Sequence, residues 1–168
     1  MNVRRLLFVQ HPVARMYDLI EGAEYYPHFL PWCSSVTILE RTEHVVAATL
    51  GVDWHGVRME FTTRNRKRRP EWLELALVRG PFRHFRGEWR LKSLGTDGCK
   101  IEFLLDYEFA SDLLGRAAGP LFEHITNTLV DAFVRRADAL GNSIPSLQEV
   151  EAGAPGAAPV ERPRDVDA

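Results

Sequence analysis

Cysteine is scarce in this chain of 168 residues, and histidine is scattered. Cys33 and Cys99 lie too far apart in sequence to form the framework of a disulfide-rich fold. Neither has a second Cys or His at the spacing of a zinc site, and the six histidines include no i, i+4 pair of the kind that binds metal on a helix. The sequence therefore predicts two reduced, structural thiols and no bound metal.

Long apolar runs and an excess of one charge are also absent. No segment approaches the roughly 20 apolar residues that span a bilayer. Arg4 and Arg5 precede a short apolar run, residues 6–9, which is broken by Gln10, His11 and Pro12 and lacks the cleavage site of a signal peptide. The formal net charge of -2 gives no overall attraction to nucleic acid. We expect a cytoplasmic protein without a DNA partner, whose contact with the inner membrane is at most peripheral.

The side chains that could act in catalysis are not arranged as they are in active sites. Cys33 has no nearby cation or helix start to lower its pKa, so packing is its expected role. Glu102, Asp106 and Glu108 alternate away from an apolar strand face, which predicts a solvated outer surface rather than a carboxylate pair in a cleft. We expect no catalytic residues, no required cofactor and no enzymatic activity.

Composition divides the chain into two parts. Residues 1–142 have the apolar content of one globular domain with a sizeable core. Residues 143–168 are rich in Pro, Ala, Gly and acidic side chains, without apolar periodicity. The sequence predicts one folded domain followed by a disordered tail.

Hydrophobic periodicity predicts the order of the elements. A first strand ends near Val9, helical spacing follows from Pro12 to Gly22, and an aromatic connector with two prolines allows one short helical turn. From Val36 the period becomes two and continues to Phe109, with a turn expected at His55 and Gly56. About six further antiparallel strands result.

A long amphipathic helix closes this order. Ser111 is the predicted N-cap and Gly141 the predicted end, while Pro120 should mark a kink or break. The fold class is therefore α+β, in the order β-α-α-β6-α, with a curved antiparallel sheet of about seven strands wrapped around the C-terminal helix. Inward aromatic side chains on several strands are longer than a thin two-layer core requires, which predicts an internal cavity.

Three motifs resemble the coenzyme Q-binding START-like family, a helix-grip family related to polyketide cyclases and dehydrases. They are the segment 26–33 (YPHFLPWC), the segment 61–65 (FTTRN), and Gly80-Pro81-Phe82 followed by Gly87-Glu88-Trp89. The resemblance covers nearly all of residues 1–142 and includes a bacterial branch of ribosome-association toxins. It implies a helix-grip fold without catalytic apparatus. Its pocket or pocket-rim positions here are Phe29, Pro31, Trp32, Phe82 and Trp89.

The inward pattern adds further candidates for the cavity wall. They are Trp54, Phe61, Tyr107, Leu121, Ile125 and Leu129. Such a cavity would take an isoprenoid quinone or another apolar small molecule, because burial of apolar surface supplies the affinity at roughly 25 cal/mol per Å2.

A run of cations is the most concentrated charge in the chain. Arg64, Arg66, Lys67, Arg68 and Arg69 should lie at a strand end and the following turn, exposed to solvent. They either contact RNA phosphates or lipid headgroups, or protect a solvated sheet edge against strand pairing. The sequence leaves both open.

Two functions follow from the resemblance. The leading interpretation is non-enzymatic binding of a ubiquinone-like molecule that supports respiratory electron transport. The alternative is a toxin that binds the large ribosomal subunit and blocks 70S subunit association.

Overall fold

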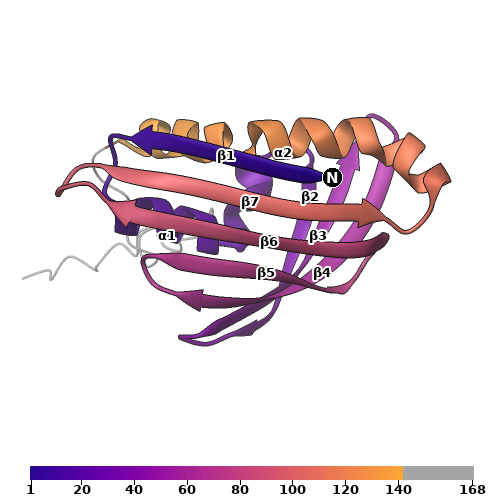
Figure 1. The fold of residues 1–168 in the computed structure, drawn as a ribbon, viewed down its shortest axis with the longest axis horizontal. Helices are drawn as coiled ribbons and strands as arrows, with labels where there is room; N and C mark the ends of the chain where they lie inside the picture. The colour runs from indigo at the N-terminus through magenta and orange to yellow at the C-terminus, as the bar shows by residue number, and fades with distance from the viewer. Residues whose placement is uncertain (142–168) are drawn as a thin grey trace, which may run out of the picture.

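A computed structural model describes residues 1–141 of the chain, and the predicted tail at 143–168 lies outside them. The α+β prediction is confirmed, since residues 1–141 form seven strands, two α-helices and a 3-10 helix in the predicted order (Figure 1). The elements are β1 (Asn2–Val9), α1 (Val13–Glu21), η1 (Ala23–His28), β2 (Cys33–Arg41), β3 (Val45–Trp54), β4 (Val57–Arg68), β5 (Trp72–Arg79), β6 (Phe82–Ser93), β7 (Cys99–Phe109) and α2 (Asp112–Leu140).

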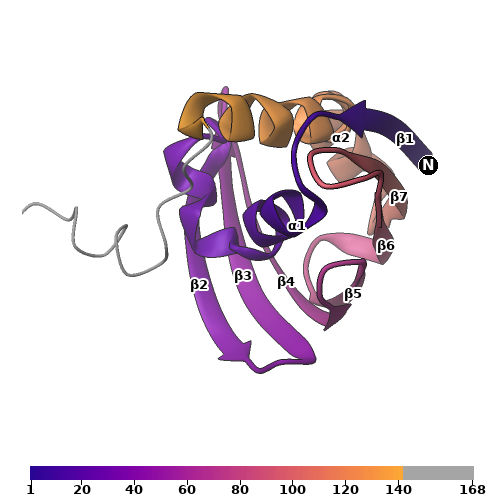
Figure 2. The same ribbon diagram turned by 90° about the vertical axis from the view of Figure 1, so that its left-hand side faces the viewer.

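The strands of the described chain form one antiparallel sheet in the order β1-β7-β6-β5-β4-β3-β2. Figure 2 shows that the sheet curves, with α2 lying along its open side and α1 held inside the curve. Register shifts within the β2–β3, β4–β5 and β6–β7 pairs accompany this curvature, because an extra residue in one strand bends it and increases its twist. The concave face is buried, and the convex face carries the polar side chains.

The turn between β3 and β4 follows from its two residues. His55 and Gly56 both have positive φ, 49° and 81°, which confirms the predicted turn. A two-residue hairpin turn of type I′ has positive φ at both central positions, and its backbone matches the twist of the flanking strands. Glycine adopts that conformation without a steric penalty, so it fits the second position.

The long helix begins as predicted but is not broken. Ser111 caps α2, because its hydroxyl oxygen accepts a hydrogen bond from the backbone N–H of Leu114 at 3.2 Å. Of the predicted kink or break at Pro120, the break is wrong, since α2 is one helix of 29 residues with the proline inside it. The kink stays a prediction. Pro120 and Arg116 are exposed, so the carbonyl left without an N–H partner faces water. Burial of apolar residues on both sides of the proline holds the helix together.

The core lies between the concave sheet, α2 and α1. Phe103, Phe133 and Met16 are among its largest fully buried side chains. Cys33 and Cys99 are buried free thiols in this core, and burial raises the pKa of each to about 11. Both are therefore protonated at neutral pH. Within residues 1–141, no helix is long and apolar enough to cross a membrane.

Candidate functional site

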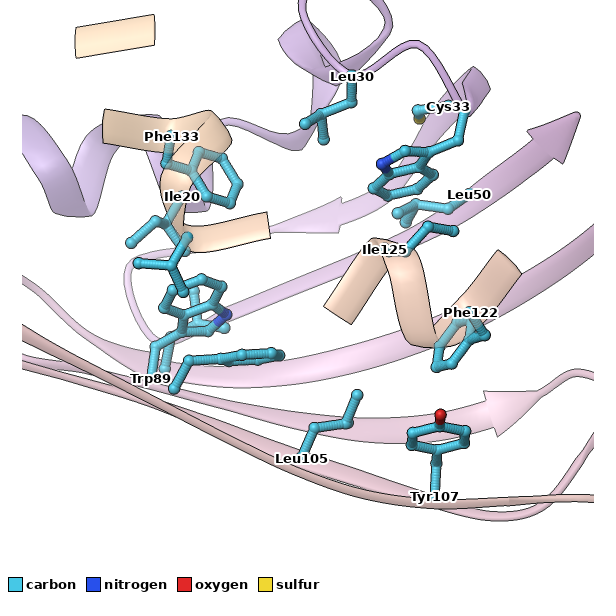
Figure 3. Packing of buried hydrophobic residues seen from close by; sticks show 14 of the residues in the cluster. Ile20, Leu30, Cys33, Leu50, Trp89, Leu105, Tyr107, Phe122, Ile125 and Phe133 are labelled. Atoms are coloured by element: carbon cyan, nitrogen blue, oxygen red, sulfur yellow. The ribbon is translucent and has the colours of Figure 1, made fainter. Parts of the chain in front are cut away.

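A largely but not fully enclosed apolar cavity of about 100 Å3 lies between the concave face of the sheet and α2. Strands β3 to β7 form its floor, α2 covers it, and α1 and η1 close one end. In Figure 3, Trp89 and Leu105 rise from the sheet while Phe122 and Ile125 descend from α2. The lining residues are Ile20, Glu21, Ala23, Tyr26, Trp32, Val46, Ala48, Leu50, Phe61, Thr63, Asn65, Leu73, Leu75, Phe85, Trp89, Phe103, Leu105, Phe122, Ile125, Thr126 and Leu129.

Five of the predicted cavity residues line this space: Trp32, Phe61, Trp89, Ile125 and Leu129. They come from four different parts of the chain, and the curvature of the sheet brings them together. Their contact with a ligand stays a prediction.

Three further candidates are buried beside the cavity rather than in its wall. Phe82, Tyr107 and Leu121 belong to the core near the start of α2. The ring of Phe82 lies 5.0 Å from that of Phe109, and the ring of Tyr107 lies 4.6 Å from that of Phe122. Strand alternation predicted Tyr107 on the inner face, and the family resemblance supplied Phe82; both are buried there. These residues pack as core, beyond the end of the cavity. Alternation gives the face of a strand on which a residue lies, but not how far along the strand a cavity extends.

The last three candidates lie away from the cavity. Phe29 packs on Phe133, 5.6 Å between ring centroids, and the guanidinium of Arg136 lies 5.3 Å from the Phe29 ring. Pro31 is exposed. Trp54 lies at the tip of the β3–β4 hairpin, with its ring 4.5 Å from that of His55. Trp54 is partly buried and packs against the core, but it does not line the cavity.

The polar groups of the cavity were not predicted. Thr63 and Asn65 follow Phe61 on the inner face of β4, and both line the cavity. The side-chain oxygen of Asn65 is buried and has no hydrogen-bond partner within residues 1–141. By contrast, the hydroxyl of Thr126 donates to the carbonyl of Glu123 at 3.1 Å. Extending the alternation of residues 57–61 along the same strand would have found Thr63 and Asn65.

Ion pairs close the end of the cavity beside α1 and η1. The carboxylate of Glu21 accepts hydrogen bonds from Lys67 at 3.0 Å and from Arg41 at 2.9 Å. Arg41 also binds Glu24, and this carboxylate raises the pKa of Arg41. Asp18 receives two hydrogen bonds of 2.9 Å from one guanidinium, that of Arg69. These contacts tie the helical segment to β2, to β4 and to the residue that follows β4.

The cationic run therefore differs from its predicted form. Full solvent exposure was wrong for Lys67, whose side chain is only 9% exposed against Glu21 because it points to the concave side of β4. Arg64 and Arg66 lie on the convex side, paired with Glu40 at 3.3 Å and with Glu74 at 2.9 Å. Arg68 and Arg69 also have acidic partners. Alternation along the strand splits one run of sequence between two faces.

The acidic residues of β7 need one correction. Asp106 and Glu108 are exposed as predicted, but Glu102 is only 8% exposed. It lies on the convex face beneath Arg4 and Arg90, whose guanidinium nitrogens are 3.0 and 3.2 Å from its carboxylate. Arginine side chains from neighbouring strands cover it, which the alternation within β7 does not reveal.

The chemistry of the cavity favours binding. Among its lining residues, Glu21 and Tyr26 carry ionisable groups. Glu21 is engaged by two cations, and burial raises the pKa of Tyr26 above its ordinary range. In residues 1–141, no three His, Cys, Asp or Glu side chains are grouped to hold a metal ion. The lining thus offers apolar surface, two threonine hydroxyls and one unpartnered amide oxygen.

Residues 9–134 match the family model described as "Polyketide cyclase / dehydrase and lipid transport". The chain belongs to this family. A START superfamily protein from Mycobacterium smegmatis shares the fold, with a TM-score of 0.69 at 21% identity over 83% of this chain and 98% of that one.

Two curated relatives differ in what their names say. The ribosome association toxin RatA of Pseudomonas aeruginosa is 37% identical over 139 residues, which cover 83% of this chain and 96% of the relative. The coenzyme Q-binding protein COQ10 homolog B of Xenopus laevis is 26% identical over 129 residues, 74% of this chain and 53% of the relative. The names of these two relatives are not those of enzymes, although the family description includes cyclases and dehydrases.

Proposed function

We propose that this protein is a RatA-type toxin that binds the large ribosomal subunit and blocks 70S subunit association. The observation that carries the proposal is 37% identity to a ribosome association toxin over 96% of that protein's length. The proposal places the ribosomal function ahead of quinone binding, which is the reverse of the order that the sequence suggested.

The size of the cavity supports the same ranking. A volume of about 100 Å3 is well below the roughly 300–1,000 Å3 of pockets that enclose cofactor-sized ligands. A polyprenyl quinone would require the walls of the cavity to move apart. Binding a ribosome through the outer surface requires no such change.

The proposal is tested by sedimentation of a bacterial extract with and without the purified full-length protein. We expect added protein to move 70S particles into free subunits in a dose-dependent way and to cosediment with the large subunit. Heat-denatured protein is the control for contaminating nucleases and salts. Undisturbed 70S particles at saturating protein would contradict the proposal.

A second candidate function is binding of an isoprenoid quinone or a smaller apolar molecule in support of respiration, with peripheral contact at the inner membrane. The apolar cavity and the likeness to the Xenopus coenzyme Q-binding relative favour it. Native mass spectrometry of the purified protein, with solvent extraction of any bound molecule, tests it. A stoichiometric quinone would support this function, and a protein that is empty and rejects added quinone would contradict it.

A further inference from the structure

The convex face of the sheet carries arginines from strands that are far apart in sequence. Cross-strand pairing places Arg66 of β4 opposite Glu74 of β5, and Glu74 opposite Glu88 of β6. The next row runs from Arg68 to Trp72, Arg90 and Glu102. We call this surface the arginine face, and it consists of Arg4, Arg66, Arg68, Arg86, Arg90, Lys92, Lys100 and Trp72, with Glu71, Glu74, Glu88, Glu102 and Asp106 among them.

Three of its carboxylates lie beneath the cations. The side chains of Glu74, Glu88 and Glu102 are 18%, 29% and 11% exposed, and their arginine partners are 56–77% exposed. Arg90 illustrates this layering, because it donates to Glu88 at 2.8 and 3.0 Å and to Glu102 at 3.2 Å. The carboxylates hold the guanidiniums in place, and the solvent meets mainly positive groups.

The face has an excess of positive charge. Within residues 1–141 it holds seven cations and five carboxylates, although the whole chain has a formal net charge of -2. Arginine suits the recognition of phosphate, because its planar guanidinium donates two parallel hydrogen bonds and is weakly hydrated. Guanidiniums already oriented by a carboxylate lose less side-chain entropy when a phosphate binds.

An open groove lies in this face beside an indole ring. It has a volume of about 670 Å3, and its walls include Arg68, Trp72, Arg90 and Lys92. The indole N–H of Trp72 donates to Glu88 at 2.8 Å, which fixes the ring. Arg66 and Arg68 lie 5.8 and 5.9 Å from the centre of the indole ring system. Guanidiniums beside an aromatic ring provide both phosphate contacts and a stacking surface for a base.

We propose that the arginine face binds the sugar–phosphate backbone of RNA, and that the groove beside Trp72 takes one nucleotide. This inference deepens the proposed ribosomal function and rests on it, since it names the surface that meets the RNA of the large subunit. It also changes the role of the cationic run. Arg66 and Arg68 act with arginines from β1 and β6, whereas Lys67 and Arg69 hold the helical segment against the sheet.

A triple variant, Arg68→Ser with Arg86→Ser and Lys92→Ser, tests the face without leaving a buried carboxylate unpaired. Arg68 pairs with Glu71, which is itself 63% exposed. Arg86 lies 3.9 Å from Glu74, which keeps its closer contact with Arg66. The matched control removes the same charge elsewhere, by Arg58→Ser at the β3–β4 hairpin with Arg116→Ser and Arg135→Ser on α2. Thermal unfolding establishes that both triples fold.

Binding of each full-length protein is measured against purified large ribosomal subunits and against protein-free large-subunit RNA, over a series of KCl concentrations. Each lost phosphate contact should lower the slope of log K against log[KCl] by about 1. For both probes, we expect the triple variant of the arginine face to show a salt slope lower by about two to three and an affinity lower by at least tenfold. The control triple should bind as the wild type does.

Each outcome decides one of the two proposals. If the wild type binds subunits and the two triples weaken equally or not at all, the arginine face is refuted and the ribosomal function stands. If the wild type binds RNA but not subunits, and the face triple loses that binding, the face stands and the ribosomal function falls. Binding to neither probe overturns both.

Discussion

Replacing Asn65 by leucine should stabilise the protein, which is unusual for a change at a buried position. The side-chain oxygen of Asn65 is buried against the cavity without a hydrogen-bond partner in the described chain. A buried polar group without a partner costs about 1–3 kcal/mol. Leucine removes that cost, and its two methyl groups, which replace the amide oxygen and nitrogen and are bulkier, can occupy part of the space of about 100 Å3. Some repacking strain opposes the gain.

We therefore expect Asn65→Leu to raise the free energy of unfolding by about 1–2 kcal/mol. For a domain of this size the corresponding rise in Tm is about 3–6 °C. Urea denaturation followed by circular dichroism gives the free energy, and the m-value checks that the unfolded state is unchanged.

Asn65→Ala is the control, because it removes the same oxygen but enlarges the cavity. It should be less stable than Asn65→Leu by about 2 kcal/mol or more, as for other cavity-forming changes. A leucine variant that is less stable than the wild type would refute the reasoning. That result would mean that ordered water satisfies the oxygen, or that the cavity wall cannot accept a larger side chain.

Three further predictions concern other parts of the fold. Glu21→Ala should lower the free energy of unfolding by about 1–3 kcal/mol, because it leaves the largely buried Lys67 without its carboxylate. In a double-mutant cycle, adding Lys67→Met should recover most of that loss, and no recovery would contradict the pairing. Burial raises the pKa of Tyr17 to about 12, from an ordinary value of 10. The folded state therefore holds the Tyr17 proton more tightly than the unfolded state, so the stability that the neutral phenol provides is present below pH 10 and lost as pH rises toward 12. Between pH 10 and 12 the urea midpoint of Tyr17→Phe should fall less steeply than that of the wild type. Parallel plots of urea midpoint against pH for the two proteins would contradict this prediction. Pro120→Ala should raise Tm, because it restores the N–H that α2 lacks at an exposed position; an unchanged or lower Tm would show that the helix gains nothing from that hydrogen bond.

The outcome at β4 shows how far periodicity reaches. Alternation along residues 57–62 correctly gave a strand and placed Phe61 on the inner face, and the strand itself continues to Arg68. The same alternation also places Thr63, Asn65 and Lys67 inside, but the concentration of charge in that segment suggested exposure. Lys67 tolerates the inner side because Glu21, 46 positions earlier in the chain, meets it there. A contact at that sequence separation leaves no local signal.

The cavity and the arginine face have the same origin. Trp32, Phe61 and Trp89 become neighbours of one space only when the sheet curves around α2. Arg4, Arg68 and Arg90 become one surface only when β1, β4 and β6 take their places in the sheet. The degree of curvature, set by the register shifts, decides which inward side chains meet and which pack as core.

The sequence by itself determined the order of the elements, the caps of α2, the turn after β3 and the family, because each depends on residues within a few positions of one another or on motifs in fixed order. Only the tertiary structure decided the volume of the cavity, the burial of Glu102, the pairing of Lys67 with Glu21, and the gathering of arginines above their carboxylates. Those properties depend on strand register and on distances between elements, which no local pattern of residues encodes.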